Sequence, residues 1–320
     1  MKSRSPLHVE VTRGPLVENI HQVVAVVIDK QKKVVGSAGT PDYVVTPRSC
    51  MKPLQALPLL ETGAYEALGL NERHIALACS SHKAEPHQME VLKAWLHQLG
   101  LEEKILYCGP ATGHTSLLTH NCSGKHLGMI SAARQLKMDP VGYGKFEHPF
   151  QMHLRKYLTE ITEIDFSKAP HAIDGCCIPT YGVSLQKLAM AMSLLLSDET
   201  SNPHQKYFSK VFESMQKHPE YVSGMNEFVC RVNRVSEGRA LVKTGADGVY
   251  IGFMPQQGLT FALKVIDGAV QAAEAASLYL LKEYGALTSE EIEKIQGSVE
   301  PFVLNSKNEK VGVIRVQSMS

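Results

Sequence analysis

The stretch Arg239–Gly268, RALVKTGADGVYIGFMPQQGLTFALKVIDG, carries the clearest fold signal in the chain. Its three apolar segments, which contain many β-branched and aromatic residues, are separated by the segments Gly245–Gly248 and Pro255–Gly258. Glycine, proline and aspartate favour turns, and short apolar segments between turns are typical of strands. The stretch therefore predicts a three-stranded antiparallel meander.

Further strands are expected near both ends of the chain. HQVVAVVID and KVVGSAG flank a polar turn and predict a hairpin over residues 21–39, and VGVIRV at residues 311–316 predicts a final strand. Shorter strands are predicted at residues 74–81 and 171–182. Helical spacing predicts helices at residues 49–68, 85–99, 121–136, 149–161, 183–196, 203–217, 225–235 and 269–284, with a short one near Glu290.

These elements predict an α+β fold in which an antiparallel sheet is flanked by helices. The sheet is expected to combine the N- and C-terminal segments, with a helical middle, in a single domain over residues 1–320. The sequence shows no internal repeat and no linker that would divide it.

Composition excludes several classes of partner. The 320 residues are 44% hydrophobic and 20% charged, and a net charge of +1 gives no support for nucleic acid or an anionic membrane surface. No apolar run is long enough to span a bilayer. The first residues, MKSRSPLHVEVTRG, lack the apolar core of a signal peptide. We therefore expect a cytoplasmic protein whose seven cysteines are reduced.

The segment Pro47–Pro53, PRSCMKP, places a serine three residues before a lysine. Pro53 has no N–H to bond to the Ser49 carbonyl, so Ser49 is expected at a helix N-terminus with Lys52 on the same face. This spacing suits a nucleophile and its base, although a lysine base requires a pKa lowered from about 10.4 to about 7. The alternative is two polar residues in the first turn of a solvated helix.

Three further segments carry reactive side chains. ACSSHKAEPH places Ser80, Ser81 and His82 between two predicted elements, where they are either reactive loop residues or turn and cap residues. HNCSGKH places Cys122, Lys125 and His126 in the first turn of a helix, which favours a lowered thiol pKa and hence a nucleophile or metal ligand. IDGCCIP places Asp174, Cys176 and Cys177 after a strand.

Each of these segments also has a structural interpretation. Cys122 can be an inert buried thiol, and the aspartate and two cysteines can form a β-turn with core thiols. The other interpretation is that Asp174 binds a substrate ammonium group and that Cys176 joins Cys122 at a metal. No CxxC pair or HExxH motif is present, so spacing alone does not indicate zinc.

A late Lys243-Thr244-Gly245 follows the early Ser-x-x-Lys. This combination is the pattern of penicillin-recognising acyl transferases. The intervening Ser-Asp-Asn element is missing, and Thr119-His120-Asn121 is its nearest substitute.

Taken in order, six segments resemble the rhizobial-type L-asparaginase II family over nearly the full length: TPRSCMKPLQAL, ALACSSHKAEPH, HNCSGKH, DGCCIP, KTGADGVY and ALKVIDG. The resemblance implies hydrolysis of L-asparagine to L-aspartate and ammonia, an architecture similar to serine β-lactamases and glutaminases, and a homodimer. It implies two Ser–Lys pairs, Ser49 with Lys52 and Ser81 with Lys264. It also implies a zinc site of Cys122, Lys125 and Cys176, with substrate-binding residues Arg48, Asp174, His82 and His126.

The chain departs from the family pattern at two places. Lys83-Ala84 stands where the family usually has a residue followed by glycine, which removes freedom to adopt positive φ. Cys177 stands beside Cys176, so either thiol is a candidate metal ligand.

The family resemblance predicts acyl-enzyme chemistry, in which Lys52 takes the proton of Ser49 and Ser81 assists the leaving group. Zinc is expected to be structural or to orient the substrate amino acid. The alternatives are a glutaminase, a penicillin-recognising-type serine hydrolase, and a non-catalytic homologue that binds an amino acid or zinc. The preference for asparagine over glutamine is left open, because it depends on one methylene group.

Overall fold

The computed structural model describes residues 2–3, 5–296 and 301–317. The chain forms two compact units. Unit 1 contains Met1–Val45, Val183–Leu196 and Arg231–Ser320, and unit 2 contains Thr46–Gly182 and Ser197–Cys230. The expectation of a single domain stays a prediction.

Unit 1 contains most of the strands. They are β1 (Lys2–Ser3), β2 (Leu7–Arg13), β3 (Leu16–Asp29), β4 (Val34–Ala38), β5 (Val44–Val45), β8 (Val183–Ser184), β9 (Leu241–Thr244), β10 (Val249–Met254), β11 (Leu259–Val265), β12 (Phe302–Leu304) and β13 (Lys310–Gln317). Its helical elements are α8 (Leu185–Ser193), η4 (Leu194–Leu196), η5 (Ala246–Gly248), α12 (Val270–Glu283) and α13 (Ser289–Gln296). Helix α11 (Phe228–Val235) begins in unit 2 and ends in unit 1.

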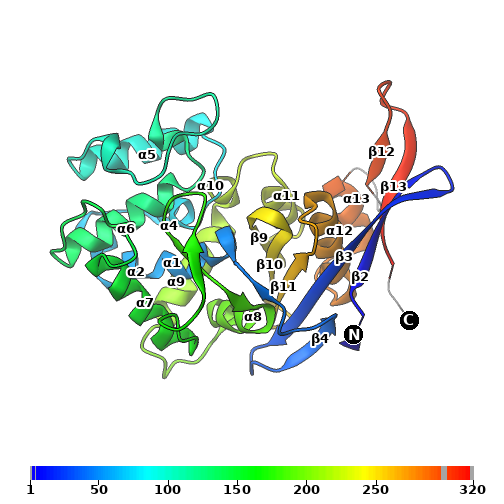
Figure 1. Cartoon of the computed structure of the whole chain (residues 1–320), viewed down its shortest axis with the longest axis horizontal. Coiled ribbons are helices and arrows are strands. Elements are labelled where there is room, and N and C mark those ends of the chain that lie inside the picture. Colours follow the sequence, from blue (N-terminus) through cyan, green and yellow to red (C-terminus); the bar gives the residue numbers. More distant parts are fainter. Residues whose placement is uncertain (1, 4, 297–300, 318–320) are drawn as a thin grey trace. The chain divides into compact units, whose positions relative to one another are not determined.

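Nine of the described strands form one sheet in unit 1 (Figure 1). The order is β12-β13-β2-β3-β11-β10-β9, with β4 beside β3 and β1 beside β4. The predicted meander is confirmed, because β10 pairs antiparallel with both β9 and β11. The predicted hairpin is confirmed by the antiparallel pair β3 and β4. Strands β3 and β11 lie side by side, so the two ends of the chain meet within the sheet.

Helices cover both faces of this sheet. Phe261, Ala262 and Leu263 follow one another in β11, and each is fully buried. Because successive strand residues point to opposite faces, both faces must be covered. Helix α8 packs against β3 and β11, and α12 packs against β10, β11 and β13. The predicted α+β class, an antiparallel sheet flanked by helices, is confirmed.

Unit 2 is mainly helical. Its helices are α1 (Lys52–Gln55), α2 (Leu57–Glu61), α3 (Ala64–Ala67), α4 (Glu72–Ala78), α5 (Pro86–Gln98), α6 (Ser123–Gln135), α7 (Pro149–Thr162), α9 (Gln205–Lys217) and α10 (Pro219–Val222). Three 3₁₀ turns, η1 (Arg48–Met51), η2 (Glu103–Ile105) and η3 (Leu117–Thr119), and the strands β6 (His171–Ile173) and β7 (Pro179–Tyr181) complete it. Helix α4 packs against α6 and α9.

The strand predicted at residues 74–81 is wrong, because most of this segment belongs to α4. The helix begins with a capping box in which the Asn71 side chain accepts a hydrogen bond from the backbone of Arg73 at 3.1 Å. Ile75, Ala76 and Leu77 are all buried, so the segment lacks the polar face that identifies a helix in a sequence. Length and apolar content could not separate a buried strand from a buried helix here.

Two other predicted elements are interrupted. The helix expected over residues 49–68 is divided into η1, α1, α2 and α3, with Pro53 and Pro58 at helix starts and Gly63 at φ +78°. The strand expected over residues 171–182 folds back on itself as the hairpin of β6 and β7. The turn of that hairpin contains Asp174, whose N–H bonds to the carbonyl of Ile178 at 2.8 Å.

Candidate functional site

Lys52 is buried in unit 2 and contacts a serine from a different segment. Lys52 is the first residue of α1, and only 1% of its surface is exposed. The Nζ atom donates to Ser81 Oγ at 3.2 Å and to the carbonyl of Ser80. Ser49 lies in η1, one turn earlier, and is half-buried. Among the described residues its hydroxyl has no hydrogen-bonding partner, so the structure pairs Lys52 with Ser81.

The loop that carries Ser81 connects α4 to α5 and is held by backbone bonds. The N–H of Ser81 donates to the carbonyl of Val222 at 2.8 Å. Ala84 has φ +56°, so the left-handed conformation persists although alanine stands where the family usually has glycine. A Cβ in this region costs roughly 1–2 kcal/mol. Lys83, the other departure, forms an exposed ion pair with Glu227 at 3.3 Å.

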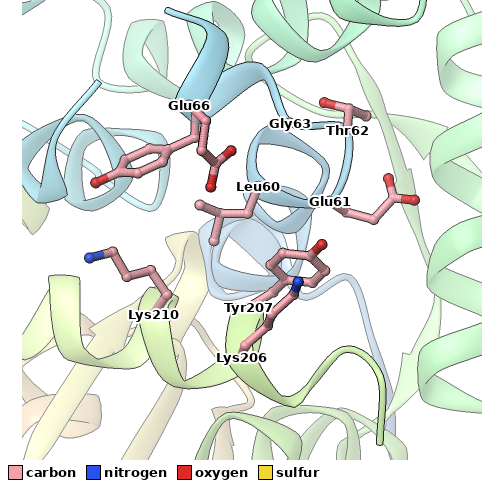
Figure 2. A pocket seen from close by; sticks show the side chains of 9 residues that line it. Leu60, Glu61, Thr62, Gly63, Glu66, Lys206, Tyr207 and Lys210 are labelled. Atoms are coloured by element: carbon pink, nitrogen blue, oxygen red, sulfur yellow. The ribbon is translucent and has the colours of Figure 1, made fainter. Parts of the chain in front are cut away.

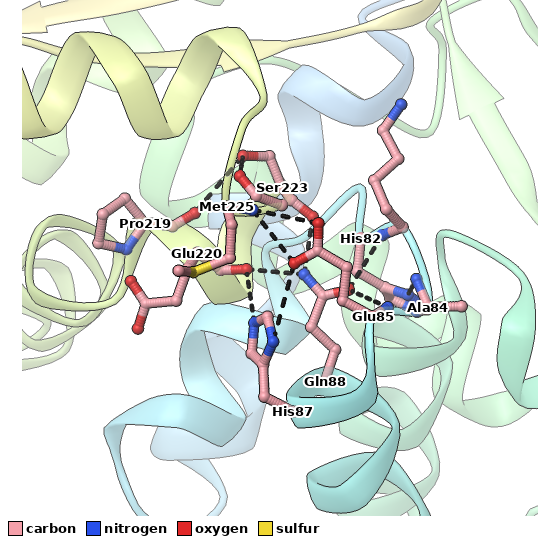
Figure 3. A network of polar contacts seen from close by, with 11 residues as sticks. His82, Ala84, Glu85, His87, Gln88, Pro219, Glu220, Ser223 and Met225 are labelled. Atoms are coloured by element: carbon pink, nitrogen blue, oxygen red, sulfur yellow. Dashed lines mark hydrogen bonds and ion pairs between the residues drawn. The ribbon is translucent and has the colours of Figure 1, made fainter.

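Hydrogen bonds through the Gln88 side chain connect the Ser81 loop to α10 (Figure 3). The Gln88 side chain accepts from the N–H groups of Lys83 and Glu85, both at 3.0 Å. Its amide nitrogen donates to the carbonyls of Glu220 at 2.7 Å and Ser223 at 2.8 Å. A single buried amide therefore fixes the position of the segment after Ser81.

His82 is bonded through both ring nitrogens. Nδ1 lies 3.1 Å from the N–H of Ala84 and must accept from it. Nε2 lies 2.9 Å from Ser123 Oγ, and that hydroxyl donates to the carbonyl of Leu118 at 2.8 Å. His82 is therefore neutral with its proton on Nε2. Burial, followed by the charge of Lys52, lowers the pKa of His82 to about 3. The geometry indicates a structural role for His82 between the Ser81 loop and α6.

The predicted metal ligands come together in unit 2. Lys125 Nζ lies 2.9 Å from Cys176 Sγ, and Lys125 is only 3% exposed. Cys176 Sγ also lies 3.6 Å from Asp174 Oδ2. Cys122 is buried at the N-cap position of α6, one turn before Lys125. Cys176 is buried whereas Cys177 is exposed, which favours Cys176 as the thiol that faces this cluster.

Charges in the cluster favour one thiolate. A hydrogen bond from Cys176, supported by Lys52 and Lys125, lowers the pKa of Cys122 well below its ordinary value despite burial. The same hydrogen bond, and then burial, raise the pKa of Cys176. Burial acts to lower the pKa of Lys125, but Cys176 and Cys122 outweigh it and the pKa is raised. The cluster therefore holds a thiolate beside an ammonium group.

Close packing of two helices positions this cluster. Gly124 lies against α4, where a Cβ would be 2.2 Å from the carbonyl oxygen of Leu77. Only glycine allows this approach, which brings the N-terminus of α6 to the end of α4 that leads to Ser81. The glycine of the HNCSGKH segment thus links the thiol cluster to the serine loop.

An ion pair connects the Ser49 segment to the same cluster. Arg48 Nε donates to Asp174 Oδ1 at 2.6 Å, and both side chains are largely buried. Burial acts to raise the pKa of Asp174, but Lys125 and Arg48 outweigh it and hold the pKa below its ordinary value. Arg48 has φ +51° and Cys177 has φ +67°. Left-handed non-glycine residues are strained and concentrate at functional sites.

His126 is fully buried in α6 next to Lys125. Its Nδ1 is hydrogen-bonded to the hydroxyl of Tyr143, which also accepts from the N–H of Tyr107 at 3.2 Å. Burial, followed by the charge of Lys125, lowers the pKa of His126 well below its ordinary value.

Lys264 lies on β11 in unit 1, whereas its predicted partner Ser81 lies in unit 2. Its Nζ bonds to the carbonyl oxygens of Asp247 at 2.8 Å and of Val265. Burial lowers the pKa of Lys264. Lys243 is fully buried on β9 in the same unit. The pairing of Ser81 with Lys264 stays a prediction.

A separate cavity of about 550 Å³ lies in unit 2 (Figure 2). Glu61 and Glu66 line one wall, from α2 and α3, and Lys206 and Lys210 of α9 line the other. None of the predicted site residues is among its lining residues.

Together, the α+β fold, the buried lysine and thiol groups and the half-buried Ser49 and Ser81 give the protein the side chains of an enzyme active site. The family model described as L-asparaginase II matches residues 9–316. The chain therefore belongs to the L-asparaginase II family, as its motifs predicted, and it is an asparaginase-type amidohydrolase with a small-molecule substrate. No helix among the described residues is both long enough and apolar enough to cross a membrane.

Several solved structures align with the chain at low identity. A β-lactamase from Mycobacterium bovis is 16% identical, with a TM-score of 0.47, covering 82% of this chain and 94% of that one. Mglu in its glutamate form is 13% identical, with a TM-score of 0.49, covering 82% of this chain and 61% of that one. A β-lactamase from Francisella tularensis is 12% identical, with a TM-score of 0.37, covering 82% and 95%. Among curated proteins, none matches the chain.

Sequence reasoning missed three residues that organise the site. Ser123 orients His82, Tyr143 bonds to His126, and Gln88 fixes the serine loop. Ser123 and Gln88 follow helix starts, where capping signals could have indicated them. Tyr143 lies in an irregular segment, and nothing in its local pattern indicates the contact.

Proposed function

We propose that this chain hydrolyses L-asparagine to L-aspartate and ammonia through a serine acyl-enzyme. The observation that supports this most strongly is the buried Lys52 amine bonded to Ser81 Oγ at 3.2 Å, with Ser49 one turn away on the Lys52 segment. A hydroxyl bonded to an amine, with a second hydroxyl one turn away in the chain, can supply a nucleophile, a base and a leaving-group acid. Family membership supports the amide substrate.

The contact favours Ser81 as the attacking hydroxyl, in place of the sequence-based choice of Ser49. Neutral Lys52 takes the Ser81 proton, and the oxygen attacks the side-chain amide carbon. The C–N bond breaks, and the leaving nitrogen takes a proton through Ser49 and departs as ammonia. Water then attacks the ester carbon, aspartate leaves, and the proton returns to Ser81. Lys264 is the fourth residue of the proposed catalytic set, with Ser49, Lys52 and Ser81.

Substrate recognition is proposed for the charged groups around this centre. Arg48 suits the substrate carboxylate, and Asp174 suits the ammonium group, since the lowered pKa of Asp174 keeps it ionised. In the structure the two groups neutralise each other at 2.6 Å. A zwitterionic amino acid offers one partner to each, so its binding replaces this ion pair without leaving a buried charge unpaired.

The donor set fits zinc. Two buried thiols are soft donors, and the lowered pKa of Cys122 favours the thiolate form that a metal needs. The raised pKa of Lys125 means that its amine becomes the third donor only when it loses a proton to make room for the ion. Cys122, Lys125 and Cys176 would hold the ion, which would act as a Lewis acid and orient the substrate amino acid. The remaining chemistry belongs to the serine and lysine groups.

Ammonia release from asparagine and from glutamine tests the proposal, with nitrocefin hydrolysis as the test for penicillin-type chemistry. Purified protein incubated with asparagine and quenched is examined by mass spectrometry for an aspartyl adduct. Ser81→Ala is expected to abolish the adduct, and Ser49→Ala to slow turnover while still forming it. If Ser49→Ala abolishes the adduct and Ser81→Ala still forms it, Ser49 is the nucleophile. Absence of ammonia release from either amide contradicts the proposed function and leaves the non-catalytic alternative. The homodimer stays a prediction, to be checked by light scattering.

A further inference from the structure

The cavity of about 550 Å³ in unit 2 shares no residue with the serine, lysine and thiol site. Its walls come from α2, α3 and α9, and α2 packs against both of the other helices. Leu60, only 3% exposed, lies between the charged residues of the two walls (Figure 2). Small-molecule sites usually measure about 300–1,000 Å³. The cavity therefore has the size of a ligand site, and packed helices form most of it.

The two walls carry opposite charges that do not meet. Glu66 lies on α3, and Lys206 lies on α9. In the part of the chain that the structure describes, neither side chain forms an ion pair. Opposite charges attract each other, but the open space of the cavity separates these two. A ligand that carries both a cation and an anion can bridge them.

Glu61 adds a second carboxylate to the acidic wall. It is the last residue of α2 and is half-buried. Its Oε2 is buried and makes no hydrogen bond to any described residue, and His153 Nε2 lies 3.8 Å away, beyond hydrogen-bonding distance. Polar groups in such positions normally have a partner. The acidic wall can therefore accept hydrogen bonds from an ammonium group.

Aromatic rings support the basic wall. Lys206 Nζ lies 4.9 Å from the centroid of the Tyr207 ring, and Lys210 Nζ lies 5.8 Å from that of Tyr65. Both distances suit cation–π contacts. Lys210 also donates to Glu72 Oε1 at 3.2 Å, which compensates its charge. Lys206 is therefore the cation of this wall that is best placed to bind an anion.

The size of the cavity favours a ligand whose charges are far apart. A sphere of about 550 Å³ has a diameter of roughly 10 Å, which is an approximate measure of the span between the walls. The ammonium and carboxylate groups of a free amino acid are bonded to one carbon and lie only about 3 Å apart. An extended chain advances about 3.3–3.6 Å per residue, so a peptide of two or three residues separates its terminal charges by roughly 6–9 Å. A short peptide matches the cavity better than a single amino acid does.

We propose that this cavity is a second binding site, for a short peptide of two or three residues with both termini unmodified. Glu61 and Glu66 bind its terminal ammonium group, Lys206 binds its terminal carboxylate, and its backbone lies over Leu60. The site is distinct from the proposed catalytic centre, and the inference does not depend on the proposed function.

Calorimetric titration with trialanine tests the class of ligand, because this peptide is charged only at its termini. Saturating L-aspartate is present throughout, so that the proposed catalytic centre is occupied. Trialanine is expected to bind at one site. N-acetyl-trialanine lacks the ammonium group and trialanine amide lacks the carboxylate, so each is expected to bind at least tenfold more weakly. Absence of trialanine binding, or equal binding of all three peptides, contradicts the proposal. Free alanine that binds as tightly as trialanine overturns the assignment to a peptide.

Glu66→Gln and Lys206→Met test the location of the site. Each is expected to weaken trialanine binding about tenfold, the effect of one hydrogen bond to a charged group. Glu66→Gln should also reduce the preference for trialanine over its N-acetyl form, and Lys206→Met the preference over its amide, since each variant removes the group that reads that terminus. Glu90→Gln and Lys93→Met make the same changes at exposed positions of α5 and are the matched controls.

The control variants are expected to bind trialanine as the wild type does. Unchanged binding in both cavity variants, or equal weakening in cavity and control variants, overturns the location. No step of the titration uses turnover of asparagine. Absence of peptide binding and absence of ammonia release are therefore separate results, and each contradicts a different proposal.

Discussion

Lys52 Nζ bonds to Ser81 Oγ at 3.2 Å, although the three helices α2, α3 and α4 separate the Lys52 segment from the Ser81 loop in the sequence. In the proposed mechanism, this contact makes Lys52 the group that exchanges a proton with Ser81. Lys52→Met is expected to lower turnover by at least 10²–10⁴-fold, because it removes the general base. Lys52→Arg is expected to remain inactive, since guanidinium does not deprotonate. Ammonia release is measured, with the exposed Lys83→Met as the control. Near-normal turnover in Lys52→Met would show that this amine is not the base.

Ala84 holds a left-handed conformation at φ +56° in the serine loop. Ala84→Gly is expected to raise the free energy of unfolding by about 1 kcal/mol, because glycine removes the Cβ strain. Ala94→Gly is the control, since Ala94 is exposed within α5 and its replacement is expected to lower stability by about 0.5–1 kcal/mol. Urea unfolding measures both. The prediction is wrong if both substitutions change stability in the same direction.

Gly124 allows α6 to approach α4, because a Cβ would lie 2.2 Å from the carbonyl oxygen of Leu77. Gly124→Ala is expected to destabilise the fold by about 1–3 kcal/mol and to reduce activity by moving Lys125. Gly128, on the same helix, is less crowded, with the Cβ of Ala78 at 3.3 Å from a Cβ built there. Gly128→Ala should therefore cost less. Thermal unfolding of both variants checks the order, and an equal cost counts against the close-approach argument.

The pKa of His82 makes the free energy of unfolding depend on pH. Its pKa is about 3 in the folded chain and about 6.5 when unfolded, so below pH 6.5 the unfolded state binds the extra proton. Its contribution to stability is fully present above pH 6.5 and is lost as pH falls towards 3, by roughly 1.4 kcal/mol per pH unit. His82→Gln is expected to be less stable at neutral pH but to lose stability less steeply below pH 6.5. Urea unfolding across this range measures the difference in slope, which should correspond to one proton. Parallel profiles for the two proteins would exclude this role.

Cys176 and Cys177, in the turn between β6 and β7, are the two candidates for the same zinc ligand. Cys176 is buried and Cys177 is exposed, so substitution can distinguish them. Cys176→Ser and Cys122→Ser are expected to reduce zinc content at least tenfold, because serine is a poor ligand for zinc. Cys177→Ser makes the same change at the exposed neighbour and is expected to retain the metal. Elemental analysis after dialysis measures content, and KM for asparagine reports the effect on substrate. If Cys177→Ser lost zinc and Cys176→Ser retained it, Cys177 would be the zinc ligand and the prediction would be wrong.

Local patterns were enough to predict the hairpin, the meander and the final strand of the sheet, and the amphipathic helices, but not β1, β2 or β12. The meander of β9, β10 and β11 was visible because turns separate its apolar segments. Helix α4 was not, since its last four residues, Ile75 to Ala78, are all apolar and buried and show no helical alternation of polar and apolar positions. In the site, the motifs indicated the reactive residues but not their partners. Sequence spacing favoured Ser49 for Lys52, whereas the lysine bonds to Ser81, a contact that depends on how α1 and α4 pack.

The pairing of β13 with β2 has a consequence for how the chain acquires its structure. Val9 of β2 pairs with Val316 of β13, so β2 has no permanent neighbour on that side until β13 is made. At about 5–20 residues per second, ribosomal synthesis leaves β2 waiting roughly 15–60 s. Residues 46–182 of unit 2 are made in one continuous run during that interval. The helical segment can therefore collapse while the nascent sheet still exposes an open edge, at which another chain can pair.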